Sequence, residues 1–170
     1  APQRTITTGS FSKLLAPGLR TGWMILPPHL VEGFATHLLN SYISPNQYAQ
    51  ATICAAVTTD AYVQHLKRLR QTYRRRLQTA EQALEAHLQP LGATWPAPQG
   101  GFFFGVTVPA TKQPIWELAP AYDLLLVNGD GFFYERTKTN FVRIPFCSLT
   151  EDDIEQGIER LGQAVRENRA

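Results

Sequence analysis

The sequence predicts an α/β fold in its first part and an α+β fold in its second part. Strand-length apolar segments alternate with helical patterns at the start of the chain. A helical pattern without proline or glycine then runs over 61–88 and is long enough to join two domains. After Pro90 the chain changes to short alternations of strand and turn. We therefore expect one domain at 1–70 and a second at 71–170, joined by a long helix.

The first domain is expected to open with two strands. β-Branched residues at 4–8 predict a strand that ends at Gly9. The apolar run at 19–26 has the length of a strand and predicts one that is buried on both faces. Lys13 therefore falls in the turn region between two strands.

Three helices follow these strands. Pro27 and Pro28 can start a helix over 29–39, where apolar residues recur every four positions. Asn46 can cap the next helix, and its many alanines suit tight packing. Asp60 is expected to cap the long helix.

The second domain is expected to contain three strands and two helices. The strand patterns lie at 102–108, 124–127 and 141–146, and a short helix is expected at 115–119. Thr150 begins a capping box for the last helix. One apolar face of that helix is formed by Ile154, Ile158, Leu161 and Val165.

The composition indicates a globular chain and names no partner. Hydrophobic residues make up 44% and charged residues 18%, a balance that argues against disorder. The formal net charge of +2 is too small to imply nucleic acid or an anionic membrane. The chain has no run of 18 apolar residues and no signal-like N-terminus, so we expect a cytoplasmic protein.

Metal-binding and disulfide patterns are missing from the sequence. Cys54 and Cys147 lie far apart and form no CxxC pair, which favours two reduced thiols. No acidic or cysteine partner stands at ligand spacing from any of the four histidines, His29, His37, His65 and His87. We therefore expect no metal site.

A lysine occupies an unusual place in the stretch 9–23, GSFSKLLAPGLRTGW. The Lys13 amine becomes a nucleophile when its pKa is lowered, and it can then form a Schiff base. The hydroxyls of Ser10 and Ser12 and the forked cation of Arg20 suit a phosphate dianion. An amine for an aldehyde and a phosphate cradle together describe pyridoxal phosphate. An exposed loop lysine without chemistry is the alternative, because a short motif alone is weak.

The stretch resembles the signature of the fold-type I aminotransferases of class I/II. It is most similar to the branch with 2-aminoadipate-type aminotransferases and the effector domains of MocR-type regulators. The resemblance covers effectively the whole chain and is carried by Ser10-Phe11-Ser12-Lys13, Pro17-Gly18-Leu19-Arg20, Gly22-Trp23, Pro98-Gln99-Gly100-Gly101-Phe102-Phe103, 128–133 and 141–146. It implies the C-terminal portion of a pyridoxal-phosphate-dependent transferase fold of the aspartate aminotransferase type, with part of the large domain at 1–70 and the small domain at 71–170.

The resemblance also implies roles in cofactor binding. Lys13 would form the internal aldimine with pyridoxal 5′-phosphate and then move the proton between Cα and C4′. Ser10, Ser12 and Arg20 would hold the cofactor phosphate.

Arg143 is the candidate residue for substrate binding. It is one cation in a strand of Phe, Val, Ile and Phe, where an unpaired charge is unfavourable, so an anion is expected beside it. A salt bridge to a carboxylate of this chain is one possibility. The resemblance implies instead that Arg143 binds the α-carboxylate of the substrate and that Gly101 lets the backbone approach it.

The resemblance implies an aminotransferase that moves an amino group between an α-amino acid and a 2-oxo acid, as a homodimer in the full-length protein and away from membranes. Family residues that pair with the cofactor ring precede the lysine and are not in this sequence, so we expect the chain alone to be inactive. The alternatives are a non-catalytic effector-sensing domain of a MocR-type regulator, with nucleic acid bound only by a domain upstream, and a non-catalytic remnant.

A basic stretch at 67–76 offers a competing interpretation. It carries six cations in ten residues and could follow the phosphates of a nucleic acid. Its cations, however, surround an apolar stripe of Leu66, Leu69, Tyr73 and Leu77. This pattern favours the solvated face of a long helix.

Overall fold

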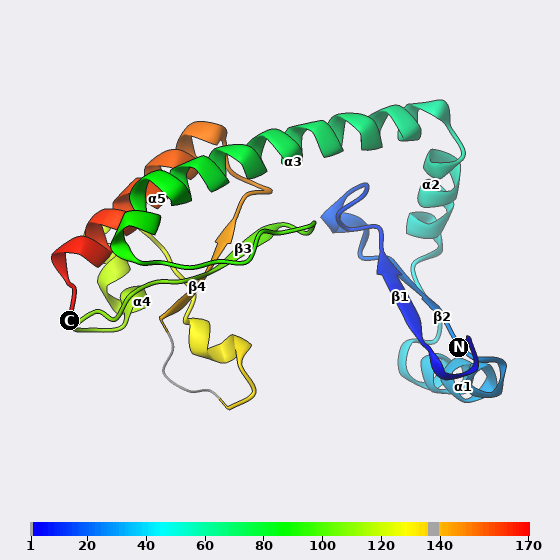
Figure 1. Cartoon of the computed structure of the whole chain (residues 1–170). Coiled ribbons are helices and arrows are strands. Elements are labelled where there is room, and N and C mark those ends of the chain that lie inside the picture. The colour runs from blue at the N-terminus through cyan, green and yellow to red at the C-terminus, as the bar shows by residue number, and fades with distance from the viewer. Residues whose placement is uncertain (1, 136–139) are drawn as a thin grey trace. The chain divides into compact units, whose positions relative to one another are not determined.

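The computed structural model describes residues 2–135 and 140–170 of the 170-residue chain. The chain divides into two compact units, which we name unit 1, Ala1–Arg68, and unit 2, Leu69–Ala170 (Figure 1). Each contains helices and a two-stranded antiparallel sheet, so the expectation of a mixed α and β chain is confirmed. The assignment of 1–70 and 71–170 to a large and a small domain stays a prediction.

Unit 1 opens with a hairpin of two short strands. Strand β1, Thr7–Ser10, pairs antiparallel with β2, Gly22–Ile25, with Ser10 opposite Gly22. Both predicted strands therefore exist, although β1 begins later because a 3₁₀ helix, Pro2–Arg4, takes up the start of the chain.

The predicted burial of the second strand is wrong. Trp23, Met24 and Ile25 of β2 are 43%, 48% and 62% exposed. The reason is physical, because within residues 2–135 and 140–170 the hairpin has no third strand beside it. An apolar run of strand length indicates side chains that favour burial, but other elements must pack on them before they are buried.

The three predicted helices of the first part are confirmed. They are α1, Pro28–Tyr42, α2, Gln47–Val57, and α3, Asp60–His87. The cap of α2 is as expected, since the Asn46 side-chain oxygen accepts a hydrogen bond from the Ala49 amide at 3.0 Å. The tight packing expected of α2 is wrong, because among its residues only Ala49 and Ile53 are buried in the described structure.

The start of α3 differs from the prediction by one residue. The hydroxyl of Thr59 accepts a hydrogen bond from the Tyr62 amide at 3.3 Å, so Thr59 supplies the cap. Asp60 is the first residue of the helix, where its negative charge interacts favourably with the positive end of the helix dipole. A threonine and an aspartate in sequence both suit a helix start, and the one nearer the N-terminus provides the cap.

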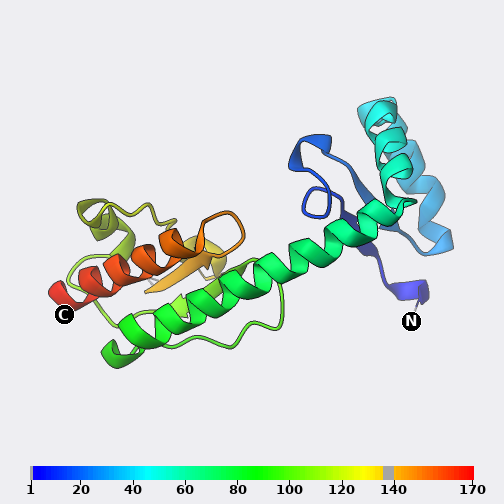
Figure 2. The same ribbon diagram turned by 90° about the horizontal axis from the view of Figure 1, so that it is seen from above.

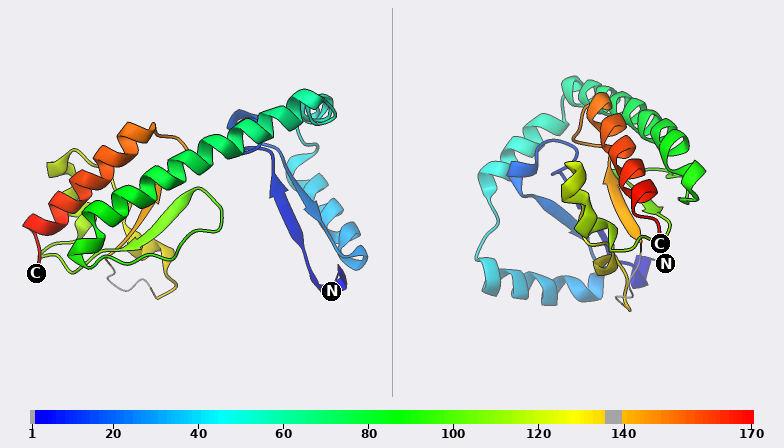
Figure 3. Two further views of the ribbon diagram at one scale, coloured as in Figure 1. Left: turned by 45° about the horizontal axis from the view of Figure 1, so that its top comes forward. Right: turned by 90° about the vertical axis from the view of Figure 1, so that its left-hand side faces the viewer.

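Unit 2 is built on a second hairpin covered by helices. Strand β3, Phe103–Thr107, pairs antiparallel with β4, Phe141–Pro145, with Gly105 opposite Arg143. The short helix α4, Ile115–Leu118, and the last helix α5, Glu151–Glu167, complete the predicted elements. The second half of α3 and α5 run side by side on one face of the sheet (Figures 1 and 2), and Figure 3 shows this pair from two other directions.

The hydrophobic core lies between this sheet and these helices. It includes Phe104 and Val106 of β3 and Val142 and Ile144 of β4, which alternate with outward-facing neighbours. The helices contribute Ala80, Ala83, Leu84, Ile154, Ile158, Leu161, Ala164 and Val165. The predicted apolar face of α5 is therefore confirmed.

The strand expected at 124–127 is wrong. Leu124 and Leu126 pack against the core, while Leu125 is 94% and Val127 64% exposed, so the side chains alternate as in a strand. The segment forms no ladder in the described structure, and a pocket of about 360 Å³ lies between it, the end of β4 and α5. Alternation alone does not make a strand, since a ladder also needs a neighbouring backbone in register.

The capping box of α5 is confirmed. The Thr150 hydroxyl accepts from the Asp153 amide at 3.1 Å, and the Asp153 carboxylate accepts from the Thr150 amide at 3.2 Å. Of the helices formed by residues 2–135 and 140–170, none is long and apolar enough to cross a membrane. The same residues contain no cluster of side chains that could hold a metal ion.

Candidate functional site

The lysine singled out in the sequence lies on the loop that joins β1 to β2. The base of the loop is closed by a hydrogen bond from the Phe11 amide to the Thr21 carbonyl at 3.1 Å. Above it the amides of Leu14 and Leu15 donate to the Phe11 carbonyl at 3.2 and 2.9 Å. These bonds form a tight turn that carries Lys13 with its side chain exposed.

Ser10 precedes this turn as the last residue of β1, and Ser12 lies inside it. The Ser12 amide donates to the Ser10 hydroxyl oxygen at 3.1 Å, so the Ser10 side chain is folded over the loop backbone. Ser10 is exposed and Ser12 is half-buried. Two hydroxyl groups, each able to donate to an anionic group, thus lie close to the lysine in sequence.

Arg20 ends the loop in a strained backbone conformation. Its φ of 47° is left-handed, a region that non-glycine residues seldom adopt. The residue caps the 3₁₀ helix η2, Pro17–Leu19, and its guanidinium donates to the Pro17 carbonyl at 3.3 Å. The Arg20 side chain is exposed. Its other N–H groups keep the forked geometry that suits a phosphate.

Two glycines allow the strands beneath the loop to approach closely. A Cβ at Gly9 would overlap the ring of Trp23, which stands opposite it in β2. A Cβ at Gly22 would lie 2.9 Å from the Gly9 carbonyl oxygen. The glycines and the tryptophan of the sequence signature therefore position the ends of the lysine loop.

A pocket of about 630 Å³ lies beside the end of this loop in unit 1. Its lining includes Arg20, Leu38, Tyr42, Asn46 and Gln50, from the loop, α1 and the start of α2. Within the described part of the chain, neither the lysine nor the two serines contribute to this lining. Of the four predicted cofactor-binding residues, only Arg20 therefore lines this pocket.

Arg143 lies in unit 2 on the outer face of β4. Its guanidinium carbon is 4.2 Å from the centroid of the Phe103 ring and 4.4 Å from that of the Phe132 ring. Phe132 belongs to the 3₁₀ helix η5, Gly129–Phe132. The ion pairs found in the described structure are Arg75 with Glu151 and Arg160 with Asp123, so a carboxylate of residues 2–135 or 140–170 does not pair with Arg143.

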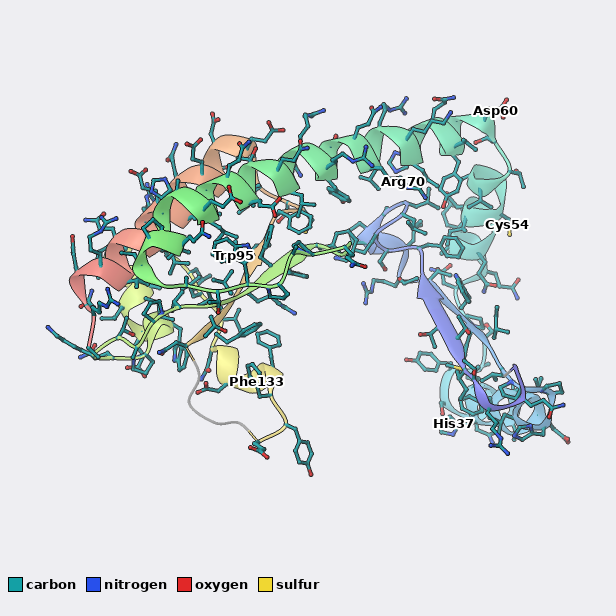
Figure 4. The ribbon with its side chains drawn as sticks, in the orientation of Figure 1. His37, Cys54, Asp60, Arg70, Trp95 and Phe133 are labelled. Atoms are coloured by element: carbon teal, nitrogen blue, oxygen red, sulfur yellow. The ribbon has the colours of Figure 1, made fainter. Side chains whose placement is uncertain are left out.

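The sequence reasoning missed Phe103 and Phe132 as neighbours of this arginine. Phe103 could have been found, because pairing the two predicted strands places it diagonally from Arg143 on one face. Phe132 could not, because its position depends on the turn of η5. Figure 4 labels the next residue, Phe133, which lies on the side of the sheet away from α5.

Gly101 precedes β3 with a left-handed φ of 89°. An added Cβ would contact nothing within 4 Å, so the backbone conformation and not lack of space requires glycine here. Its approach to a substrate stays a prediction, as do the roles of the lysine loop residues.

Some cations of the basic stretch of α3 make contacts within unit 2. Arg75 pairs with Glu151 at 3.2 Å, and Arg76 donates to the Cys147 carbonyl at 2.6 Å. Tyr73 and Leu77 pack against the core, as the apolar stripe predicted. Figure 4 labels Arg70 on the same helix, where it is exposed. This arrangement supports a solvated helix face.

Comparison with known proteins shows the family to which this chain belongs. The family model described as aminotransferase class I and II matches residues 1–161. The chain is 32% identical to aromatic-amino-acid aminotransferase 1 of Thermococcus litoralis over 96% of this chain and 40% of that protein. It is 31% identical to YdfD of Bacillus subtilis, an uncharacterised HTH-type transcriptional regulator, over 94% of this chain and 33% of that protein.

Solved structures show the same similarity in three dimensions. Kynurenine aminotransferase of Pyrococcus horikoshii matches with a TM-score of 0.90 and 31% identity, covering 97% of this chain and 41% of that one. The multiple substrate aminotransferase of Thermococcus profundus gives 0.89 and 32%, with the same coverage. The expected aspartate aminotransferase-like fold is thereby confirmed. The chain spans 33% to 41% of the length of these four proteins.

Proposed function

Because this chain belongs to the class I and II aminotransferase family, we propose that it is part of a pyridoxal-phosphate-dependent enzyme that moves an amino group between an α-amino acid and a 2-oxo acid. The observation that carries the proposal is the loop between β1 and β2. It gathers an exposed lysine, two serine hydroxyls and an arginine on one short connection whose ends are held together by strand pairing.

The donor set of this loop fits pyridoxal phosphate. The cofactor has an aldehyde at one position and a phosphate at another, and it supplies an electron-withdrawing ring that stabilises negative charge at the substrate Cα. The Lys13 amine suits the aldehyde. The Ser10 and Ser12 hydroxyls and the Arg20 guanidinium suit the phosphate, because charge-assisted hydrogen bonds to an anion are the strong ones.

Two residues would act on the substrate. Lys13 would take the proton from the substrate Cα and return it at the other end of the transfer, as a positioned general base and acid. Arg143 would bind the α-carboxylate through two parallel N–H groups, which orients Cα relative to the lysine. Its lack of a carboxylate partner in the described structure supports this role.

Selective chemical trapping tests the cofactor assignment on the chain as it is. The chain is mixed with pyridoxal phosphate, reduced with borohydride and digested, and the labelled lysines are measured by mass spectrometry. We expect Lys13 to be labelled in preference to Lys67 and Lys112, two other lysines of the described structure. Pyridoxal without the phosphate should label the three without this preference.

The phosphate contacts provide the control for that experiment. Arg20→Ala should reduce Lys13 labelling about tenfold, because a hydrogen bond to a charged group contributes about 1.5 kcal/mol. Lys67→Ala should leave it unchanged. Equal labelling of all three lysines by both aldehydes would contradict the proposed cofactor site. Turnover of an amino acid by this chain alone is not expected.

A second candidate function is effector sensing in a transcriptional regulator. Similarity to YdfD and to YisV, another uncharacterised HTH-type regulator of Bacillus subtilis, favours it. In that case the polypeptide that contains this chain would bind cofactor and amino acid without transfer, and another domain would bind nucleic acid. A coupled assay for the product 2-oxo acid, carried out on the polypeptide that contains this chain, separates the two functions. Only an enzyme releases many molecules of the 2-oxo acid per molecule of protein.

A homodimer and a cytoplasmic location complete the proposal. Large apolar side chains of unit 1 are exposed and favour association, among them Trp23, Met24, Ile25, Leu38, Leu39 and Ile43. Cys54 and Cys147 are both free thiols, which suits a reducing compartment. Sedimentation velocity tests the dimer, and a monomer at all concentrations would contradict it. Fractionation of the source cells tests the location.

A further inference from the structure

We propose that Phe103 and Phe132 are positioning residues that hold the guanidinium of Arg143 by stacking, so that Arg143 receives a planar carboxylate along its N–H edge. The identity of that carboxylate, the α-carboxylate of an amino or 2-oxo acid, rests on the proposed function. We call this arrangement of Phe103, Phe132 and Arg143 the clamp. It rests on the geometry of unit 2.

The sheet places the arginine and one ring on the same face. Residues of β3 and β4 alternate between the two faces, and Phe104, Val106, Val142 and Ile144 point into the core. Phe103 and Arg143 therefore point outward. Gly105 stands directly opposite Arg143 and has no side chain, which leaves Phe103 as a diagonal neighbour in reach of the guanidinium.

The second ring is held in place by its own packing. Phe132 contacts the ring of Phe141 edge to face, with centroids 6.0 Å apart. Its helix η5 is fixed where Gly129 passes Phe141, since a Cβ at Gly129 would overlap the Phe141 carbonyl. The Phe132 ring is thus positioned independently of the arginine that it contacts at 4.4 Å.

Stacking leaves the hydrogen-bonding capacity of Arg143 available. An aromatic face attracts the cation through its quadrupole but accepts none of the N–H groups at the guanidinium edge. A carboxylate partner would occupy these donors, and in the part of the chain that the structure describes Arg143 has none. The rings therefore hold the charge while keeping its edge ready for an external anion.

The expected gain is in pre-organisation. A guanidinium confined by two rings loses less conformational freedom on binding, and ordering one long side chain corresponds to about a two- to tenfold change in affinity. A lysine could not replace Arg143, because an ammonium group has no plane to stack and no fork to match a carboxylate.

Arginine side-chain NMR tests the clamp on the whole chain, without cofactor or turnover. In the ¹⁵N-arginine-labelled protein, the Nε–H signal of Arg143 is assigned by its loss in Arg143→Lys. We expect it to be shifted upfield by the two rings. Phe103→Leu and Phe132→Leu should each reduce that shift, while Phe132→Tyr, which keeps a ring, should retain it.

Phe133→Leu is the matched control. Phe133 is 42% exposed against 43% for Phe132, and it also packs on Phe141, with centroids 5.3 Å apart. Among the described residues the Arg143 guanidinium stacks on Phe103 and Phe132 and not on Phe133, so loss of the Phe133 ring should leave the Nε–H signal unchanged.

Titration with sodium pyruvate in carboxylate-free buffer measures the consequence. Pyruvate should shift the Arg143 signal, with affinity reduced about two- to tenfold in Phe103→Leu and Phe132→Leu and unchanged in Phe133→Leu and Phe132→Tyr. An unshifted wild-type signal, or equal behaviour of Phe132→Leu and Phe133→Leu, overturns the clamp. If Phe103→Leu fails to fold, the Phe132 pair decides alone.

The outcome separates this inference from the proposed function. Lys13 trapping that fails while pyruvate still reports the clamp rejects the cofactor site alone. Selective trapping at Lys13 with no difference between Phe132→Leu and Phe133→Leu rejects the clamp alone.

Discussion

The two units of this chain differ sharply in how they bury their apolar residues. Every member of the large core cluster in the described structure belongs to unit 2. In the described residues of unit 1, burial is limited to Pro27, Ala49 and Ile53, and the residues of β2 are exposed. Both units have a two-stranded sheet, but only that of unit 2 is covered by two long helices on one face.

This difference bears on the two roles proposed for the chain. Unit 2 carries Arg143, the proposed carboxylate-binding residue, on a sheet that its own helices cover. Unit 1 carries the proposed cofactor loop on a hairpin, and isolated hairpins are marginally stable in water. We therefore expect Arg143 to hold its geometry in this chain more firmly than Lys13 holds its own.

The largest expected effect comes from a cavity in the core of unit 2. Phe104 is 0% exposed and contacts Phe146 edge to face at 5.8 Å. Phe104→Ala should lower the free energy of unfolding by about 3–5 kcal/mol. In unit 1, Leu39 is 62% exposed, and Leu39→Ala should change it by less than about 0.5 kcal/mol.

Urea titration followed by tryptophan fluorescence measures both changes. Trp95 and Trp116 pack against the core of unit 2, so a Trp23→Phe background reports Phe104→Ala in that unit alone. Trp23 belongs to unit 1, so a background with Trp95 and Trp116 both replaced by Phe reports Leu39→Ala. A comparable loss of stability in the two variants would mean that unit 1 buries Leu39 in solution.

A smaller contrast concerns glycines that contact a neighbour in each unit. In unit 2, a Cβ at Gly129 would overlap the backbone carbonyl of Phe141, which is part of β4 and cannot move. Gly129→Ala should therefore lower the free energy of unfolding by about 1–3 kcal/mol. In unit 1, a Cβ at Gly9 meets the ring of Trp23, which is 43% exposed and can swing away.

Gly9→Ala should accordingly have the smaller effect on stability but a visible one on fluorescence. The indole would turn into solvent, and its emission should shift to the red. Thermal unfolding by circular dichroism ranks the two variants, and a larger loss in Gly9→Ala would show that the hairpin of unit 1 is more rigid than its exposure indicates.

The sequence predicts those features that depend on neighbours along the chain. The caps at Asn46 and Thr150 and the apolar face of α5 are of this kind, because each depends on residues three or four positions apart. The burial of 19–26 and the strand at 124–127 were wrong, because each required a partner element that is not set by its own residues. Features set by a local sequence pattern are predictable, whereas burial of a segment by other elements is not.

The candidate site follows the same division. The order of Ser10, Ser12, Lys13 and Arg20 predicts one loop, and the strand register confirms a short connection between β1 and β2. The contact of Phe132 with Arg143 arises only when η5 and β4 come together. Such a contact is invisible to spacing, although the strand containing Arg143 was correctly expected.

A modest effect is expected from the helix caps of the two units. Thr150→Ala removes the capping box of α5 and should lower the free energy of unfolding of unit 2 by about 1 kcal/mol. Asn46→Ala removes a similar bond from α2. Its effect should appear as lost helicity at 222 nm with little change in the urea midpoint reported by Trp95. A shift of that midpoint as large as the one in Thr150→Ala would mean that the units unfold together.

The smallest effect is the pH dependence of one cap. The pKa of Asp153 lies below the ordinary carboxyl value, first because the Thr150 hydroxyl donates to it at 2.6 Å and then because the Thr150 amide does so. A lowered folded-state pKa gives a contribution that is fully present above the unfolded value and is lost as the pH falls through the folded one.

Asp153→Asn should therefore be less stable than the wild type at pH 6, and the difference should shrink as the pH falls below about 4. The Asn46 cap of unit 1 is an amide and does not titrate, so the difference between Asn46→Ala and the wild type should stay constant over that range. Urea midpoints for unit 2 and helicity for unit 1, measured from pH 6 to pH 3, compare the two caps. A constant difference for Asp153→Asn would show that ionisation of the carboxyl group does not strengthen its hydrogen bonds with Thr150 in solution, because a charged acceptor forms the stronger bonds.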